Sequence, residues 1–480
     1  MDTLMSVVAD CLPSPAVASS DDAGRDLISF LPDDIDRISS LPDELRKNIV
    51  GRLPIRDAVR TSAVSPLWRD IWVSAPLNLD DSDLLRIRED DRVRVISRLL
   101  RNHQGPLCSV RLQFSFFEYH KDDLLLWARI LASKSVEDLV FLNQPMPVDL
   151  DLPSEILRCA SLSRLYIGFF RFPNTSGLQR HSGVFPCLKE LGLCHTIVET
   201  RDFDYMMHCS PGLETLAIVA SYSHPDRVCV RSHSQLRCVL LWLSMTDEVI
   251  MENVICLQRL LLWKTSTVSG VFPMTVKIAH TPKLRVLGYL DTGVHKLQIG
   301  NTTIEVGTQA SSSTMVPSVQ VLALRVFFGD KKQSKLLPAF LRCFPNIVTL
   351  HIESTNAGRP TGKISLTSWL NNSGPLECVE RHVKRIFLHG FQGDRAEIAF
   401  LKFIAEIAEE LKEMVIVVSS KVLDRLDMIE EKLKDIGCAY WASKDARLKA
   451  SKSKSVFSFQ MVSDLGLDDP FDCIFASKNP

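Results

Sequence analysis

Residues 184–193 read VFPCLKELGL, and this short stretch shows the pattern that governs most of the chain. Its leucines, Leu188, Leu191 and Leu193, stand at the spacing L-x-x-L-x-L. Pro186 stands two residues ahead of the first leucine. Proline cannot continue a helix, and it lacks the N–H that a central strand position needs. The stretch therefore predicts a helix-to-strand junction followed by a short buried strand.

The same apolar triplet recurs on both sides of that stretch. Between Leu107 and Leu284 successive triplets begin 21 to 29 residues apart, which is the spacing of leucine-rich repeats, about 20–29 residues. A proline stands two residues ahead of the triplet in several repeats, so the abundance of leucine does not explain the pattern; these prolines are Pro186, Pro211, Pro282, Pro317 and Pro345. The triplets are Leu107/Val110/Leu112, Val136/Leu139/Phe141, Leu162/Leu165/Ile167, Leu188/Leu191/Leu193, Leu213/Leu216/Ile218, Leu236/Val239/Leu241, Leu257/Leu260/Leu262, Leu284/Leu287/Tyr289, Val319/Leu322/Leu324, Ile347/Leu350/Ile352 and Val383/Ile386/Leu388.

Each repeat is predicted to contain a helix, a proline corner and a short strand. Ahead of Ile347, for example, apolar residues follow the helical spacing i, i+3, i+4, i+7; they are Leu337, Phe340, Leu341 and Phe344. One such unit cannot bury its apolar side alone, so neighbouring units must stack. The step from Leu284 to Val319 is longer and contains an extra strand-like run, Lys296–Val306. The prediction is a curved α/β solenoid.

A different pattern precedes the repeats. Residues 38–79 read ISSLPDELRKNIVGRLPIRDAVRTSAVSPLWRDIWVSAPLNL. Pro42 suits the first position of a helix, and Gly51 and Pro54 end that helix. A second short helix follows, and Pro66 opens a third. Three short helices in about forty residues hold too little core to be stable alone, and they leave apolar surface for a partner.

This segment resembles the F-box family. The resemblance runs from Leu41-Pro42, through Leu45 and Ile49, to Val64-Ser65 and Trp68-Arg69 at the other end. It implies that the segment binds a Skp-type adaptor, which attaches to a cullin carrying the ubiquitin-transferring machinery. The residues implied to form the adaptor-facing or interface-supporting surface are Leu41, Pro42, Leu45, Ile49, Val64, Leu67 and Trp68. Apolar anchors of this kind bind a groove as one face of a helix, with tryptophan as the expected hot spot.

A third pattern follows the repeats. Residues 376–418 predict a strand over Val383–Leu388, a helix, and a strand over Val415–Val418. The apolar face of that helix carries Ile398, Leu401, Ala405, Ala408 and Leu411. This segment resembles the FBD-type domain that follows leucine-rich repeats in many plant F-box proteins, which suggests a plant source. Its expected role is to cap the last repeat.

The chain is thus predicted to be an α/β protein with a small three-helix F-box, a leucine-rich-repeat solenoid and an FBD-like end. The expected parts are a disordered leader (1–35), the F-box (36–80), the repeats (100–355), the FBD-like domain (375–440) and a C-terminal tail (441–480). The leader is rich in Ser, Asp, Ala and Pro without a clear period. The tail carries a Lys/Ser-rich run that is interpreted as a flexible basic tail or a weak nuclear signal.

Composition limits the partners. The chain has 56 basic and 57 acidic residues, so its formal net charge of −1 does not draw it to nucleic acid or to an anionic membrane. Its 13 cysteines include no C-x-x-C pair, and no histidine pair completes a zinc pattern. Unpaired thiols fit a reducing compartment, and no apolar run reaches the length of a membrane helix. The protein is expected in the nucleus or the cytoplasm. No metal site is expected.

No constellation of residues supports an enzyme. Nucleophile-elbow, P-loop and dinucleotide motifs are absent from the sequence, so no cofactor is expected. Cys194 and His195 are adjacent but are not interpreted as a catalytic pair. Trp242 and Trp263 follow repeat triplets; they are interpreted as core packing or as side chains that face a ligand on the concave side.

Two functions follow from the resemblance. The chain is expected to be the substrate-recognition subunit of a Skp-cullin-F-box E3 ubiquitin ligase, which binds the adaptor through the F-box and an unknown target protein through the repeats. The alternative is a leucine-rich-repeat interaction scaffold with a vestigial F-box, outside any ligase. The irregular repeats and the divergent second helix, RDAVRTS, motivate this alternative.

Overall fold

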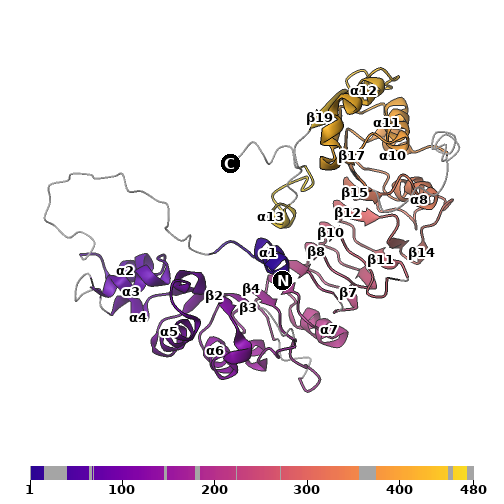
Figure 1. The fold of residues 1–480 in the computed structure, drawn as a ribbon. Coiled ribbons are helices and arrows are strands. Elements are labelled where there is room, and N and C mark those ends of the chain that lie inside the picture. The colour runs from indigo at the N-terminus through magenta and orange to yellow at the C-terminus, as the bar shows by residue number, and fades with distance from the viewer. Residues whose placement is uncertain are drawn as a thin grey trace, which may run out of the picture. The chain divides into compact units, whose positions relative to one another are not determined.

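The computed structural model describes residues 2–15, 40–63, 68, 70–144, 149–178, 184–222, 224–270, 272–355, 374–451 and 458–472. The chain divides into two compact units, each a mixture of helices and strands whose labels Figure 1 gives. The first unit holds Met1–Leu213 and Ala217–Pro225, and the second holds Glu214–Leu216 and Asp226–Pro480. Among the described residues, no helix combines the length and the apolar character needed to cross a membrane.

The first unit begins with a helix where a disordered leader was predicted. α1 spans Asp2–Asp10, and the buried side chains of this segment are Val8, Cys11 and Leu12. Arg111 Nη1 donates to the carbonyl of Pro13 at 2.8 Å, which ties the segment to the repeats. The predicted disorder of residues 1–35 is therefore wrong at its start, because the apolar stripe is too short to show a clear period; residues 16–39 lie outside the described residues.

Short helices follow, as the F-box-like segment predicts. α2 spans Asp43–Val50 and α3 spans Ile55–Arg60, and a proline is the N-cap of each. α3 continues into a 3-10 turn, η1 (Thr61–Ala63), and α4 spans Ile71–Ser74. Proline suits a helix start because its ring fixes φ and its missing N–H has no partner there in any case. α2 and α4 pack against each other.

The rest of the first unit is a parallel sheet, and most of its connections contain a helix or a 3-10 turn. The strands are β1 (Leu77–Asp80), β2 (Leu107–Ser115), β3 (Asp138–Asn143), β4 (Arg164–Gly168) and β5 (Glu190–Cys194), in that spatial order. The helices are η2 (Asp81–Leu84), α5 (Glu89–Asn102), η3 (Phe117–Tyr119), α6 (Lys121–Ser133), η4 (Ser154–Arg158) and α7 (Thr200–Cys209). β6 (Thr215–Val219) has residues in both units. Val110, Leu139, Leu165 and Leu191 are register partners and fully buried, so the middle residue of each predicted triplet forms one row of the core.

The second unit repeats this arrangement. Its parallel sheet has the order β8 (Cys238–Trp242), β10 (Arg259–Trp263), β12 (Val286–Asp291), β15 (Val321–Val326), β16 (Thr349–Ser354), β17 (Arg385–Phe391), β18 (Glu413–Val418) and β19 (Arg447–Ser451). The row of middle residues is Val239, Leu260, Leu287, Leu322, Leu350 and Ile386, all fully buried. α8 (Lys331–Arg342) occupies the predicted helix ahead of β16.

A second sheet replaces the predicted helix in the middle repeats. It consists of β7 (Arg227–Arg231), β9 (Glu248–Glu252), β11 (Met274–Ala279), β13 (His295–Ile299) and β14 (Thr302–Thr303), in the order β14-β13-β11-β9-β7. The prediction of one helix per repeat is therefore wrong here. The physical reason lies in alternating apolar residues such as Val249 and Met251, or Val276 and Ile278, which are buried on one strand face. The predicted extra run Lys296–Val306 corresponds to β13 and β14.

The strands from β4 to β11 are each followed by a residue with positive φ. After β4, β5, β6, β8 and β10 these residues are Phe169, His195, Ala220, Leu243 and Lys264. Ser232, Asn253 and His280 do the same after β7, β9 and β11. The left-handed conformation costs a non-glycine residue free energy, but its recurrence at one repeat position shows that stacking of neighbouring repeats holds it.

The C-terminal part continues the repeat sheet. α10 (Glu377–Arg381) precedes β17, α11 (Arg395–Ile407) joins β17 to β18, and η5 (Ser420–Arg425) with α12 (Leu426–Gly437) joins β18 to β19. The predicted strand–helix–strand order is confirmed. The predicted tail at 441–480 is wrong where β19 pairs with β18 and where α13 (Phe459–Ser463) forms. Leu448 and Ala450 alternate with charged residues, a weak strand signal that the basic composition hid.

Candidate functional site

Helix α2 presents an apolar pair to solvent. Leu45 is 52 % exposed and Ile49 is 39 % exposed, and their i, i+4 spacing places them on one side of the helix. Pro42 is exposed and Leu41 is half-buried at the start of the same helix. Large apolar side chains held in this way on a short helix have the form of an anchor for a partner's groove.

A small core supports this pair from behind. Its members include Val50, Ile55, Ala58 and Ile71, all buried. Trp68, the expected hot spot, is only 5 % exposed, so in the free chain its ring supports the surface from within and does not stand out from it. Val64 and Leu67 lie outside the described residues. The role of the predicted set in adaptor binding remains a prediction.

The helical segment is joined firmly to the first repeats of its unit. The main-chain N–H groups of Gln104 and Gly105 donate to the carbonyl of Val73 at 2.8 and 3.1 Å. The rings of Trp72 and His103 stack with centroids 6.2 Å apart, and burial lowers the pKa of this histidine, with Lys134 adding to the effect. A side chain in place of Gly105 has no room, because its Cβ would lie 2.4 Å from the carbonyl oxygen of Ala75. The exposed pair on α2 is therefore held at a fixed position relative to the sheet of the first unit.

The second unit carries another candidate surface, which we call the aromatic face. It lies on the side of the sheet opposite the triplet leucines, and it carries Trp242, Trp263, Tyr289, His351 and Phe387. The prediction that Tyr289 ends a buried triplet is wrong, because a register shift between Leu287 and Leu290 puts Leu290 in the buried position and turns Tyr289 to the other side. Ring centroids lie 5.6 Å apart for the tryptophan pair, 5.2 Å for Trp263 and Tyr289, and 4.4 Å for His351 and Phe387. Rows of rings suit apolar and cationic or amide contacts with a peptide.

A buried histidine is the polar centre of the aromatic face. His351 Nε2 lies 3.0 Å from an Asp469 carboxylate oxygen, and its Nδ1 lies 3.2 Å from Nε2 of His389. Burial, with His351 adding to it, lowers the pKa of His389 to about 3, so that ring is neutral at physiological pH. Burial alone would raise the pKa of Asp469, but the charge and hydrogen bond of His351 lower it below its ordinary value. The carboxylate is therefore ionised where it meets the face.

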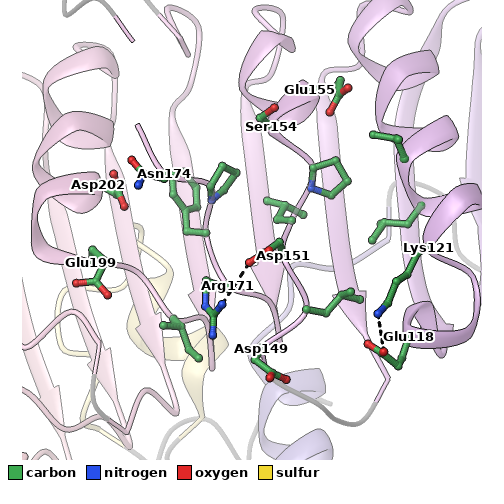
Figure 2. Close-up of a pocket in the computed structure, with 18 residues that line it drawn as sticks. Glu118, Lys121, Asp149, Asp151, Ser154, Glu155, Arg171, Asn174, Glu199 and Asp202 are labelled. Carbon is green, nitrogen blue, oxygen red and sulfur yellow. Dashed lines mark ion pairs between the residues drawn. The ribbon is translucent and has the colours of Figure 1, made fainter. Parts of the chain in front are cut away.

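The first unit also contains a groove of about 880 Å³ beside α6 and η4 (Figure 2). Its charged lining residues are Glu118, Lys121, Asp149, Asp151, Glu155, Arg171, Glu199 and Asp202. Several of these carboxylates already have partners within the chain. Arg171 lies 3.6 Å from Asp151, and Lys121 lies 2.6 Å from Glu118. Carboxylates paired in this way form a solvated polar rim, so the groove carries no further assignment.

The structure gives no chemistry to the adjacent cysteine and histidine. Cys194 is fully buried, and burial raises the pKa of its thiol to about 12, so it is not a thiolate. His195 Nδ1 lies 2.8 Å from the carbonyl oxygen of Ala220, which accepts its N–H. The described residues contain no group of three or more His, Cys, Asp and Glu side chains placed to hold a metal ion.

Comparison with known families identifies three segments. Residues 38–87 match the F-box domain, and residues 371–416 match the FBD domain. Residues 124–352 match the LRR repeats described for the FBD-associated F-box protein At5g56370. The order of the three matches is the order in which the sequence patterns occur.

Two curated relatives match more than four fifths of the chain, and a third matches about a quarter of it. The F-box/FBD/LRR-repeat protein At1g78750 of Arabidopsis thaliana is 25% identical over 453 residues, which cover 84% of this chain and 94% of the relative. F-box/LRR-repeat protein 13 of the same plant is 25% identical over 433 residues, 81% of this chain and 91% of the relative. F-box/LRR-repeat protein At3g26922 is 30% identical over 131 residues, 27% of this chain and 43% of the relative.

Proposed function

Because the chain is an F-box protein that carries leucine-rich repeats and an FBD domain, we propose that it is the substrate-recognition subunit of a Skp-cullin-F-box E3 ubiquitin ligase. Its F-box binds a Skp-type adaptor and, through it, a cullin. Its repeats bind the protein that is to be ubiquitinated. The observation that carries the proposal is the exposed pair Leu45 and Ile49 on α2, within the segment that matches the F-box.

The adaptor contact is a helix-in-groove contact. Leu45 and Ile49 enter an apolar groove of the adaptor, and the core beneath them, Trp68 included, fixes their direction. The exposed fraction of the pair means that the free chain gives up little packing when the partner binds. The N-terminal carboxylates of α2, Asp43 and Glu44, remain at the rim, where they affect association rate more than affinity.

The chain itself performs no covalent step in this proposal. It raises the effective concentration of the target near the transfer enzyme. The junction of α4 with the first repeats supports this role, because the Trp72–His103 stack and the bonds to Val73 make the F-box and its neighbouring strands one rigid piece. A flexible connection would allow the bound target many positions relative to the adaptor, whereas a rigid connection restricts these positions.

Reconstitution tests the proposal. Purified full chain, Skp-type adaptor and cullin are mixed and separated by size-exclusion chromatography with light scattering. A complex that contains one copy of each is expected. If the chain elutes alone while adaptor and cullin elute together, the proposed function is wrong.

A further inference from the structure

The aromatic face of the second unit is covered by the chain's own residues 458–472, SFQMVSDLGLDDPFD, which we call the acidic segment. Its helix α13 contacts β8 (Figure 1). Its sequence position gives no reason for this contact, because residues some two hundred positions apart meet: Arg259 Nη1 donates to the carbonyl of Val462 at 3.0 Å. The aromatic face is thus occupied by a distant part of the same chain.

Two phenylalanines anchor the acidic segment at its two ends. Phe459 meets the ring of Trp242 edge-on with centroids 5.7 Å apart, and Phe471 meets Tyr289 edge-on at 5.1 Å. Both phenylalanines are buried. Edge-to-face pairs of this kind add to the free energy gained by burying the rings. The aromatic face therefore supplies two ring pockets that are separated along the sheet.

Charged side chains of the sheet bind the residues of the acidic segment that lie between and next to the two phenylalanines. Arg259 donates to the carbonyls of Val462 and Leu467, so it binds the backbone of the segment and not a particular side chain. His351 pairs with Asp469 at 3.0 Å. Two further pairs join the segment to the sheet, Arg385 with Asp472 and Arg285 with Asp468.

The charges of segment and face are complementary. The described segment contains four aspartates, Asp464, Asp468, Asp469 and Asp472, and no lysine or arginine. The face meets it with arginines and a histidine. The backbone hydrogen bonds of the segment are internal turns, for example Val462 N–H to the carbonyl of Ser458 and Leu467 N–H to the carbonyl of Asp464. The segment thus docks through side-chain pockets, as a bound peptide does, and adds no strand to the sheet.

We propose that the aromatic face is a binding site for acidic peptide segments with two aromatic anchors, and that Ser458–Asp472 occupies it in cis. A partner protein binds there by presenting a segment of the same chemistry, and it must displace the chain's own. This inference rests on the proposed function, since it names the kind of target segment that the repeats take. A tethered occupant competes at the high effective concentration that its linker sets, so only a partner of higher affinity, or one present when the segment is released, gains the site.

The test measures binding of a fluorescent peptide with the sequence of residues 458–472 to the full chain. In Phe459→Ala/Phe471→Ala the cis anchors are removed while the face is intact, and the peptide is expected to bind on the order of tenfold tighter than to the wild type. The matched control Leu467→Ala changes an exposed side chain of the same segment and is expected to behave as the wild type. A peptide with asparagine in place of its four aspartates is expected to bind at least about tenfold more weakly.

Two results overturn the proposal. One is equal peptide binding by wild type and the double variant when both unfold cooperatively, since the segment is then a permanent part of the core. The other is equal binding of the acidic and the asparagine peptide, since the charges then do not select the ligand.

Hydrogen exchange of the wild type gives a second answer that needs no variant. The amides of Val462 and Leu467 are expected to exchange through local release of the segment, well before those of β10 and β16. Exchange of both sets only with global unfolding contradicts the proposal. Neither experiment contains adaptor or cullin, so its failure leaves the ligase role standing, and failure of adaptor binding leaves this site standing.

Discussion

The exposed pair on α2 makes a quantitative prediction. Leu45→Ala/Ile49→Ala removes three carbon atoms from each side chain, and a carbon of this kind is worth about 0.8 kcal/mol when fully buried. The free chain leaves 52 % and 39 % of the two side chains exposed, and that part is what an adaptor can still bury. The expected loss is about 2 kcal/mol of binding free energy, or about 30-fold in Kd. The rest of the two side chains is buried in the free chain, so the free energy of unfolding should also fall, by about 2–3 kcal/mol on the same scale.

Isothermal titration calorimetry of purified full chain with a purified Skp-type adaptor measures this change. The matched control is Leu178→Ala/Ile255→Ala, which deletes the same atoms from residues that are each 42% exposed in the repeats. The control should bind as the wild type does. A double variant that binds within twofold of the wild type, or a control that loses as much, refutes the assignment of α2 as the adaptor contact.

Three further predictions concern the interior. Leu260→Ala should lower the free energy of unfolding by about 2–5 kcal/mol in urea, because its side chain lies in the fully buried row of the second unit; a loss below 1 kcal/mol would show that the row is loosely packed. His295 is fully buried, and burial lowers its pKa from 6.5 to about 3, so the unfolded chain binds more protons between these values. The stability that this histidine contributes is therefore complete above pH 6.5 and falls as the pH falls, by about 2 kcal/mol at pH 5. Urea unfolding of the wild type and of His295→Gln at pH 7.5 and 5.0 measures this loss. An equal loss of stability in both proteins would exclude this histidine as the cause. Burial raises the pKa of the Cys343 thiol to about 12, whereas Cys187 is exposed, so iodoacetamide at pH 8.5 should label Cys187 far faster in a time course read by mass spectrometry; equal rates would contradict the buried position of Cys343.

The repeat strands could be predicted from the sequence because their signal is local. Each triplet places its middle residue, such as Leu191 or Leu260, in the buried row, and the proline before it marks the corner. The second sheet was missed because its strands are short and their apolar residues, such as Val276 and Ile278, alternate over only a few positions. Helix and strand cannot be separated by periodicity in runs of that length.

The cover of the aromatic face could not be predicted, because it depends on contacts between distant residues. His351 and Asp469 are 118 positions apart, and no local pattern connects them. Trp242 and Trp263 were interpreted as core packing or as ligand-facing residues. The structure places both tryptophans on the face that the acidic segment covers. Phe459 packs against Trp242 in the position that we propose for a partner's aromatic anchor. The choice between the two interpretations required the position of the acidic segment, which the sequence alone does not give.

The candidate adaptor surface was predictable in part. The i, i+4 spacing of Leu45 and Ile49 places them together on one side of α2, and a helix of this length cannot bury its whole circumference in so small a unit. The burial of Trp68 was not predictable, since an aromatic residue near a helix start serves equally as an anchor or as core. Tertiary packing decides between these, and a local pattern does not.

If the chain carries a bound protein to the ubiquitin-transferring machinery, ubiquitin accumulates on the proteins that the chain captures. Full chain and Leu45→Ala/Ile49→Ala are each incubated with plant extract, adaptor, cullin and the transfer enzymes, and the captured proteins are quantified by mass spectrometry. Both chains are expected to capture the same proteins, and ubiquitin is expected to accumulate on them only with the wild type. Equal capture with no ubiquitin in either sample would contradict the ligase role and favour a leucine-rich-repeat scaffold outside any ligase.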